Sequence, residues 1–389
     1  MKIAGVIAEY NPFHNGHAHH IAQTRRITGC DYVIVCMAGS YTQRGEAACL
    51  DKWTRARAAL MCGADSVFEL PALWAVNTAD AFARGGVAIL GGLGCDVLSF
   101  GCEAADASLL RTLADLRDEE PEALSAAVRV RLGEGKSHAR ARGEALAEYL
   151  NLSPETLNAP NLILGVEYLR AIREQQLPME IAVVPRIGGY HDDALGSVAS
   201  ASAIRMAVRR GEDARMAVPE CLHEALPQIA RMHAPDDILM HTLRGMSEAQ
   251  IAALPGVNEG LEGRVHRMAM RSPGQEALID ALKCKRYTRA RLSRLCAHAM
   301  LRLTRALMEQ HPLPEYARLI GMRRDRSALS AELKRRATLP MLSDATALAG
   351  NEVFQLECRA TDLRALQCDA PAERSAGREF TRKFVRVGS

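Results

Sequence analysis

Two histidines near the start of the chain stand where a strand-like run gives way to a helix-like one. His14 and His17 lie three residues apart in "GVIAEYNPFHNGHAHHIAQT", with Gly16 between them. If the helix begins near Asn15 or Gly16, both imidazole rings lie in its first turn. Backbone N–H groups there have no partner within the helix, and they favour an anion. Because glycine also allows a ligand to approach the backbone closely, the pattern indicates a phosphate-binding site.

Two other interpretations of these histidines are less consistent with the sequence. They could be ordinary surface or helix-capping residues, but an HxGH pattern is rarely found by chance at the first strand–helix junction. They could also bind a metal ion together with His19 and His20, yet no carboxylate or thiol stands at a suitable spacing. We therefore expect no metal ion bound by protein ligands.

A second group of polar residues follows the last expected strand. The stretch "SVASASAIRMAV" places Ser202 and Arg205 at the start of a helix, where they could clamp the β- and γ-phosphates of a nucleotide. A plain serine N-cap is the alternative. Together with the histidines, this stretch resembles the HxGH and ISSTxIR signatures of the nucleotidylyltransferase superfamily. It differs at Ala201, where the signature has a second serine, and at Ala203, which is often lysine.

Basic residues gather in further segments. The span 283–294, "KCKRYTRARLSR", holds six basic residues with Tyr287 interleaved, which favours contact with RNA over a merely solvated helix face. The residues that we expect to carry this contact are Lys285, Arg286, Arg289 and Arg291. The run 323–336 is equally compatible with either role. In the segment 43–57, Arg44 or Lys52 could close over phosphate, or the segment could be a solvated helix face.

Composition limits the class of protein. The chain has 389 residues and a formal charge of only +3, so a surface that binds nucleic acid must be local. Its 11 cysteines include no CxxC pair, which argues against a zinc ribbon or a disulfide scaffold and favours reduced thiols in a cytosol. The N-terminus has the pattern of a first strand and not of a signal peptide, and no stretch approaches the roughly 20 apolar residues of a membrane span. We therefore expect a cytoplasmic protein that does not associate with a membrane.

The elements that must position these residues alternate between strand and helix in the first half of the chain. Strand-like runs cover 2–10, 31–39, 66–71, 95–102 and 179–187, with helical runs between them. This alternation predicts an α/β fold with a doubly wound parallel sheet. A helical insertion is expected at about 105–155, inside a nucleotide-binding domain that spans 1–220. From 221 to 389 only helical patterns follow, except for a small strand in the tail after Asn351 and poor order over roughly the last 15 residues.

Longer strings narrow the resemblance. "GVIAEYNPFHNGHAHH", "YTQRGEAACLDKWTRA", "FGCE", "PNLILGVEYLRAI", "RIGGYHDD", "ASASAIR" and "KRYTRARLSR" occur in this order. The chain resembles the bacterial tRNA(Met) cytidine acetate ligase family from Met1 to about Met341. The resemblance implies an enzyme that uses ATP, with the Mg²⁺ that ATP usually carries, to activate acetate as acetyl-adenylate. The acetyl group is then expected to pass to the wobble cytidine of elongator tRNA(Met), which the C-terminal domain binds.

The resemblance also implies which residues contact ATP. They include Gly101, Asn161 and Arg186, and the continuous stretch Ile7, Ala8, Glu9, Tyr10, Asn11, Pro12, Phe13, His14, Asn15, Gly16, His17, Ala18, His19 and His20. Ser202 and Arg205 complete the expected nucleotide site, in which His14 and His17 are the catalytic residues. His19 stands where the family pattern has an aromatic residue, and Leu162 where it has a second asparagine.

Two other functions remain compatible with parts of the sequence. One is a nucleotidylyltransferase acting on a small phosphorylated substrate, but this leaves the long helical C-terminal half without a role. The other is a non-catalytic tRNA-binding protein with a vestigial nucleotide fold, against which the intact His14, Gly16, His17 and Arg205 argue. The sequence does not indicate the oligomeric state.

Overall fold

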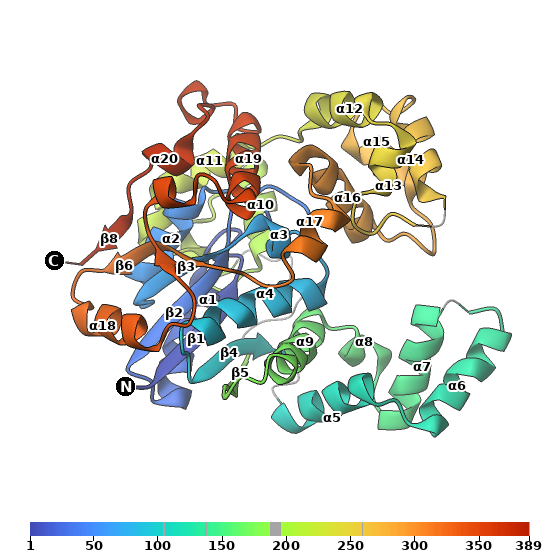
Figure 1. The fold of residues 1–389 in the computed structure, drawn as a ribbon, viewed down its shortest axis with the longest axis horizontal. Coiled ribbons are helices and arrows are strands. Elements are labelled where there is room, and N and C mark those ends of the chain that lie inside the picture. The colour runs from blue at the N-terminus through green and yellow to red at the C-terminus, as the bar shows by residue number, and fades with distance from the viewer. Residues whose placement is uncertain (104–105, 137, 187–195, 259, 389) are drawn as a thin grey trace.

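The fold is built on a central sheet that is parallel over its first five strands. The computed structural model describes residues 1–103, 106–136, 138–186, 196–258 and 260–388 (Figure 1). The strands lie in the order β5-β4-β1-β2-β3-β6-β7, and β8 pairs with β6. Their bounds are β1 Ile3–Ala8, β2 Tyr32–Ala38, β3 Ser66–Leu70, β4 Val97–Cys102, β5 Glu180–Pro185, β6 Ala317–Arg323, β7 Met341–Leu342 and β8 Val385–Val387. The expectation of a doubly wound α/β sheet is confirmed.

The winding of the sheet reverses between β1 and β4. From β1 the chain moves through β2 to β3 on one side and then crosses to β4 and β5 on the other. All pairings among these five strands are parallel. Ligands of open α/β sheets bind at the carboxyl ends of the strands where the winding reverses. A ligand is therefore expected at the loops after β1 and β4.

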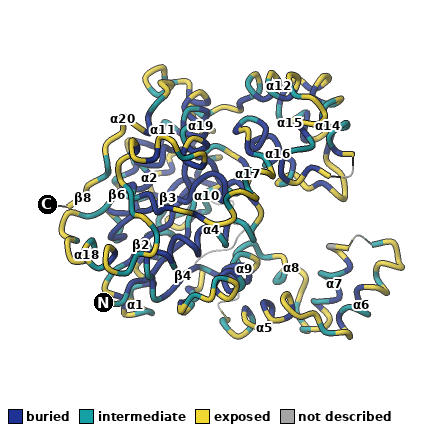
Figure 2. The backbone as a smooth tube through the Cα atoms, in the orientation of Figure 1, coloured by how far each residue is buried: buried dark blue, intermediate teal, exposed yellow. Residues whose placement is uncertain are grey.

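Helices cover both faces of this sheet, as a buried parallel sheet requires. Side chains alternate along β1: Ile3 and Ile7 enter one core, and Ala4 and Val6 enter the other. Figure 2 shows the central strands largely in dark blue, the colour of buried residues. The first core is closed by α3 Ala72–Ala75, α4 Ala79–Gly92, α9 Pro160–Glu174 and α19 Glu352–Leu366. The second is closed by α1 Asn15–Thr28, α2 Lys52–Met61, α10 Ala201–Arg209, η2 Glu220–Ala225 and α11 Leu226–Ala230.

Two helical units extend from the sheet domain. The insertion consists of α5 Ala107–Asp118, α6 Glu122–Gly133, α7 His138–Leu150 and α8 Pro154–Leu157, and α6 and α7 share a small core of their own. A second unit after η1 Arg215–Ala217 has its own apolar core and comprises α12 Asp236–Gly245, α13 Glu248–Ala252, α14 Leu261–Ala269, α15 Gln275–Leu282 and α16 Arg289–Leu301. Figure 1 shows both units beside the sheet domain, on the same side of the molecule. No helix among the described residues is long and apolar enough to cross a membrane.

The last part of the chain returns to the sheet, which differs from the sequence expectation. After α17 Arg305–Gln310, strand β6 pairs antiparallel with β3, and β7 and β8 pair with β6. The expectation of only helical patterns from 221 to the tail was therefore wrong for 317–323, and α19 lies where a tail strand was expected. The intervening elements are α18 Ser327–Arg336, η3 Ala345–Leu348, η4 Pro371–Glu373 and α20 Arg378–Thr381.

The reason for this difference is visible in β6 itself. Its sequence, ARLIGMR, has arginine at the second and last positions and is followed by further arginines, so its charged residues obscure the alternation typical of a strand. Arg318 is nevertheless buried, because carboxylates inside the protein pair with it. Tertiary pairing thus decides the conformation where local pattern does not.

Candidate nucleotide-binding site

The loop after β1 is closed by a reciprocal pair of hydrogen bonds between the two histidines, and we call residues 10–17, which contain both histidines, the nucleotide loop or histidine loop. His14 is the N-cap of α1, and its Nδ1 accepts from the backbone N–H of Gly16 at 3.1 Å. The backbone N–H of His14 in turn donates to Nδ1 of His17 at 3.2 Å. A Cβ on residue 16 would lie 2.9 Å from the His14 ring, so a larger residue would force this cap apart. Both histidines stand at the first turn of the helix, as their spacing predicted.

These hydrogen bonds determine what the two rings can donate. Because Nδ1 accepts in both residues, the geometry assigns the hydrogen of each neutral ring to Nε2. The rings stack with centroids 3.7 Å apart, and Tyr10 packs edge-on against His17 at 4.7 Å. Burial lowers the pKa of His14 to about 4, with a further contribution from Arg186. Burial and the neighbouring His14 also hold the pKa of His17 well below its usual range. Both residues are therefore neutral donors at neutral pH.

Arg205 brings the second expected segment onto this loop. Its guanidinium donates to the backbone carbonyl of Asn11 at 2.6 Å and to Oγ of Ser202 at 3.3 Å. The plain N-cap that was the alternative for this stretch is also present, on a different residue: Ser200 caps α10 by accepting from the backbone N–H of Ala203 at 3.1 Å. Arg205 and Ser202 thus lie beside the histidine loop, and Ser200 supports the helix that carries them.

The remaining residues expected to bind the nucleotide lie on the β4 side of β1, near the carboxyl ends of the strands. Gly101 is the next-to-last residue of β4, and a Cβ there would lie 3.4 Å from the side chain of Arg186, which follows β5. Burial lowers the pKa of His14, and the charge of Arg186 adds to this effect. Asn161, in the first turn of α9, donates to the Glu103 carboxylate at 2.6 Å. The remainder of the "RIGGYHDD" motif, 187–193, lies outside the described residues.

Other residues of the 7–20 stretch serve the scaffold. The side chains of Ile7 and Phe13 are buried in opposite cores, so only their backbone can face a ligand. Asn15 donates to two backbone carbonyls across the loop, each at 2.9 Å. Nε2 of His20 lies 3.4 Å from Oγ of Ser99 on β4, which ties α1 to the neighbouring strand.

The hypothesis that Lys52 closes over phosphate is contradicted by its position. Its side chain is fully buried, with Nζ 3.0 Å from the Glu357 carboxylate and 2.5 Å from that of Glu379, and it also pairs with Glu69. Burial alone would lower the pKa of Lys52, but the three carboxylates outweigh burial and raise it. This lysine cannot reach the nucleotide loop.

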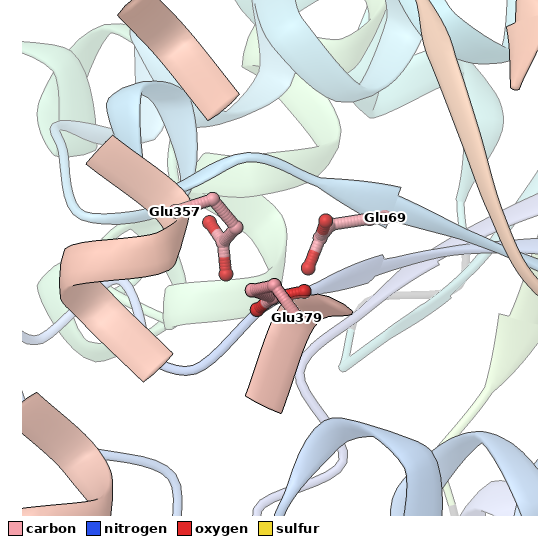
Figure 3. Close-up of side chains that lie close together, drawn as sticks. All are labelled: Glu69, Glu357 and Glu379. Atoms are coloured by element: carbon pink, nitrogen blue, oxygen red, sulfur yellow. The ribbon is translucent and has the colours of Figure 1, made fainter. Parts of the chain in front are cut away.

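The three glutamates lie close enough together to suggest a metal site. Figure 3 shows Glu69 of β3, Glu357 of α19 and Glu379 of α20 pointing toward one another. However, the Lys52 ammonium pairs with all three, and Arg318 pairs with two of them, at 2.9 Å from Glu69 and 2.5 Å from Glu379. The protein therefore supplies its own cations here. This buried network joins the C-terminal segment to the sheet.

Arg55 is a residue whose role the sequence did not reveal. Its buried guanidinium donates to the carbonyls of Glu9 at 2.6 Å, Ala38 at 3.0 Å and Leu50 at 3.0 Å, and also to that of Gly39. It thereby ties the carboxyl ends of β1 and β2 together. A recognisable signal was present: an arginine between the apolar positions of "TRARAAL", on the face of α2 that packs against the sheet.

A short hairpin after β2 supports the nucleotide loop from the other side. We call residues 41–47 the 41–47 hairpin, because Tyr41 and Ala47 form an antiparallel bridge. The backbone N–H of Gln43 donates to the Glu9 carboxylate at 2.6 Å. A Cβ on Gly45 would lie 2.7 Å from the backbone of Arg294 in α16. The hairpin therefore lies between the nucleotide loop and α16, the helix in which the basic segment ends.

The residues predicted to bind RNA lie at the start of α16 and in the turn before it. Lys285 and Arg286 are exposed in that turn. Arg289 pairs with Glu276 at 2.5 Å. Arg291 donates to the carbonyl of Gly256 at 2.7 Å and stacks over Tyr287. Arg291 thus has a structural partner within the helical unit.

The fold and this site define a nucleotidyl transferase. The family model described as "HIGH Nucleotidyl Transferase" matches residues 1–379. A tRNA(Met) cytidine acetate ligase from a Geobacillus species is 33% identical, and the match covers 97% of this chain and 98% of the relative. One from Syntrophotalea carbinolica is 39% identical over 88% of this chain and 85% of the relative. The chain belongs to the family of tRNA(Met) cytidine acetate ligases.

Solved structures agree with this assignment. The structure of Thermotoga maritima TmcAL bound with alpha-thio ATP covers all of this chain with a TM-score of 0.87 and 29% identity. The apo form of the same Thermotoga protein gives a TM-score of 0.89 and 28% identity.

Proposed function

We propose that this chain is an ATP-dependent ligase that activates acetate as acetyl-adenylate and then acetylates the wobble cytidine of elongator tRNA(Met). The observation that carries the first step is the pair of neutral histidines at the start of α1. Their Nε2–H groups are preorganised hydrogen-bond donors, so they can stabilise charge that develops on a phosphate without any reorganisation of surrounding water.

In the first step, an acetate oxygen attacks the α-phosphorus of ATP in line, and pyrophosphate leaves. Little covalent work is required of the protein, so holding the reactants and stabilising charge dominate. His14 and His17 face the phosphates from the helix N-terminus, and Arg205 supplies a positive charge beside the same loop. Gly101, Asn161 and Arg186 are assigned to the nucleoside side, at the ends of β4 and β5.

ATP would enter with Mg²⁺ on its phosphates. Magnesium prefers oxygen ligands and retains several waters, whereas His14 and His17 present ring nitrogens. We therefore assign the metal to phosphate oxygens and water, and to neither histidine.

In the second step, the acetyl group passes to the exocyclic amine of the cytidine. The base must leave the anticodon stack for this, as in other enzymes that modify bases. We assign tRNA binding to the helical unit after residue 220, with Lys285, Arg286 and Arg289 contacting the RNA backbone, whereas Arg291 is engaged within that unit by the Gly256 carbonyl and the Tyr287 ring. We place the protein in the cytoplasm, where tRNA is modified.

One incubation tests this function. The protein is mixed with labelled acetate, ATP and bulk tRNA, and acid-stable label in the RNA is measured. Label is expected to require ATP and to appear at one cytidine. Absence of label in RNA, together with nucleotide transfer to a small phosphorylated acceptor, would favour the alternative of a simple nucleotidylyltransferase.

A further inference from the structure

Glu9 stands at the border between the nucleotide loop and the 41–47 hairpin. It directly follows β1 and is half-buried. Its Oε1 accepts the 2.6 Å hydrogen bond from the backbone N–H of Gln43. Within the described part of the chain, its second carboxylate oxygen has no hydrogen-bond partner. A carboxylate held at one oxygen and open at the other is a group that can accept a proton.

The position of Glu9 relative to β1 separates it from the nucleoside side. β1 has β4 on one side and β2 on the other. Gly101 and Arg186 lie on the β4 side, whereas the hairpin that holds Glu9 follows β2. With the nucleoside on the β4 side, the β2 side is the one that the nucleoside leaves open to an acceptor.

The β2 side is also the side on which the helical unit touches the sheet domain. Gly45 of the hairpin packs directly against the backbone of Ser293 and Arg294 in α16. RNA bound near the start of α16 would therefore lie on the hairpin side of α1. Glu9 contacts this hairpin through the Gln43 N–H.

The titratable groups around Glu9 come from four elements. Burial raises the pKa of this carboxyl, and Glu46 of the hairpin adds to the effect, while the Gln43 N–H and the charges of Arg44 and Arg205 oppose it. Tyr168 of α9 and Arg55 of α2 are also close enough to interact with Glu9: its negative charge adds to burial in raising the pKa of Tyr168 and opposes burial in lowering the pKa of Arg55. A carboxylate with a raised pKa is a better base than an ordinary one, as long as it is ionised at the working pH.

We propose that Glu9 is the proton acceptor for transfer of the acetyl group, an inference that rests on the proposed function. The lone pair of cytidine N4 attacks the acetyl carbonyl carbon and forms the C–N bond. The C–O bond to the adenylate then breaks, and AMP leaves with that electron pair. N4 loses one proton, which the Glu9 carboxylate takes and later releases to water. The products are N4-acetylcytidine, AMP and a proton.

Another carboxylate near the carboxyl ends of the strands, Glu103, is less suited to accept the proton. Glu103 follows β4 and accepts the hydrogen bond from Asn161, so it lies on the nucleoside side. It provides a comparison, because Glu103→Gln removes a carboxylate from the same edge of the sheet without touching the hairpin.

The test separates the two half-reactions. Glu9→Gln can still accept from the Gln43 N–H through its amide oxygen, but it cannot take a proton. Preformed acetyl-adenylate is supplied with tRNA(Met) transcript in a single turnover, and acetate-dependent exchange of pyrophosphate into ATP is measured separately. Transfer is expected to fall by about 100-fold or more, and exchange by a much smaller factor. Glu9→Asp keeps a carboxylate and should recover part of the transfer rate.

The pH dependence gives a second readout. In the wild type, transfer should slow as the pH falls through the raised pKa of Glu9, and Glu9→Gln should lose this dependence. Glu103→Gln should keep it, and so should Gln43→Ala, which retains the backbone donor. Equal losses of transfer and exchange in Glu9→Gln, or an unchanged pH profile, would show that Glu9 only shapes the nucleotide loop. A wild-type protein that forms adenylate but never acetylates tRNA would overturn the proposed function, and this proposal with it.

Discussion

The guanidinium of Arg205 donates a 2.6 Å hydrogen bond to the backbone carbonyl of Asn11, across 194 positions of sequence. This bond joins the two segments that the sequence marked separately as nucleotide-binding. It holds the charge of Arg205 beside the histidine loop and at the same time fixes the backbone of that loop. Arg205 therefore has two roles: it places a positive charge beside the histidine loop, and it stabilises the backbone conformation of that loop.

These two roles of Arg205 can be separated by substitution. Arg205→Ala removes both and should lower pyrophosphate exchange by about 10²-fold or more, the scale of a lost donor to developing charge. Arg205→Lys keeps the charge but not the planar fork, and it should fall between the alanine variant and the wild type. Ser202→Ala removes only the 3.3 Å bond to Arg205 and should cost less than either. Equal exchange rates in all four proteins would contradict the assignment.

The histidine pair makes an equally direct prediction for catalysis. Alanine at His14 or His17 should lower acetylation by about 10²-fold or more, because each replacement removes one preorganised donor. The loss should appear already in pyrophosphate exchange, since the charge develops in that step. Far-UV circular dichroism controls for folding. Near-wild-type acetylation by both variants would exclude the proposed role.

The lowered pKa values of these histidines predict a dependence of stability on pH. An ordinary histidine titrates near 6.5, whereas burial lowers the pKa of His14 to about 4. Between these values the unfolded chain binds a proton that the folded chain does not, so the free energy of unfolding should decrease as the pH falls from about 6.5 to about 4. Guanidinium denaturation at several pH values measures this slope. His14→Gln should flatten it, and an unchanged slope would show that His14 is not the group responsible.

The sequence predicts those features of the site that depend on contacts between residues close together in the chain, and not those that depend on distant partners. The capping of α1 by His14 is local, and the first-turn position of both histidines follows from spacing alone. The α/β alternation likewise predicted strands β1 to β5. By contrast, the partners of Lys52 are Glu69, Glu357 and Glu379, which meet only after the C-terminal segment has packed on the sheet. No local pattern distinguishes such a buried lysine from one on a solvated helix face.

The buried network around Lys52 predicts a large effect on stability. Lys52→Met removes the central cation and leaves carboxylates buried without it, which should destabilise the protein by about 3–5 kcal/mol. Urea denaturation measures the change. The matched control is Lys334→Met on the surface of α18, which should change stability by less than about 0.5 kcal/mol. If Lys52→Met were as stable as the control, the network would contribute little to holding the C-terminal segment.

The basic turn before α16 predicts how tRNA binding responds to salt. Lys283 and Lys285 are exposed in this turn, and within the described residues neither has a polar partner, so both are available to phosphate groups. Each phosphate contact with single-stranded or loop RNA contributes about −0.7 to the slope of log affinity against log salt. Replacing both lysines with alanine should therefore weaken tRNA binding and flatten this slope by roughly one to two units.

Arg291→Ala serves as a comparison, because Arg291 is engaged by the Gly256 carbonyl and the Tyr287 ring. This substitution should affect the stability of the helical unit more than the salt slope. Filter binding at several salt concentrations gives the slopes, and pyrophosphate exchange without tRNA checks that the nucleotide site is intact. If the lysine variant kept the wild-type slope, the RNA backbone would have to bind elsewhere on the helical unit.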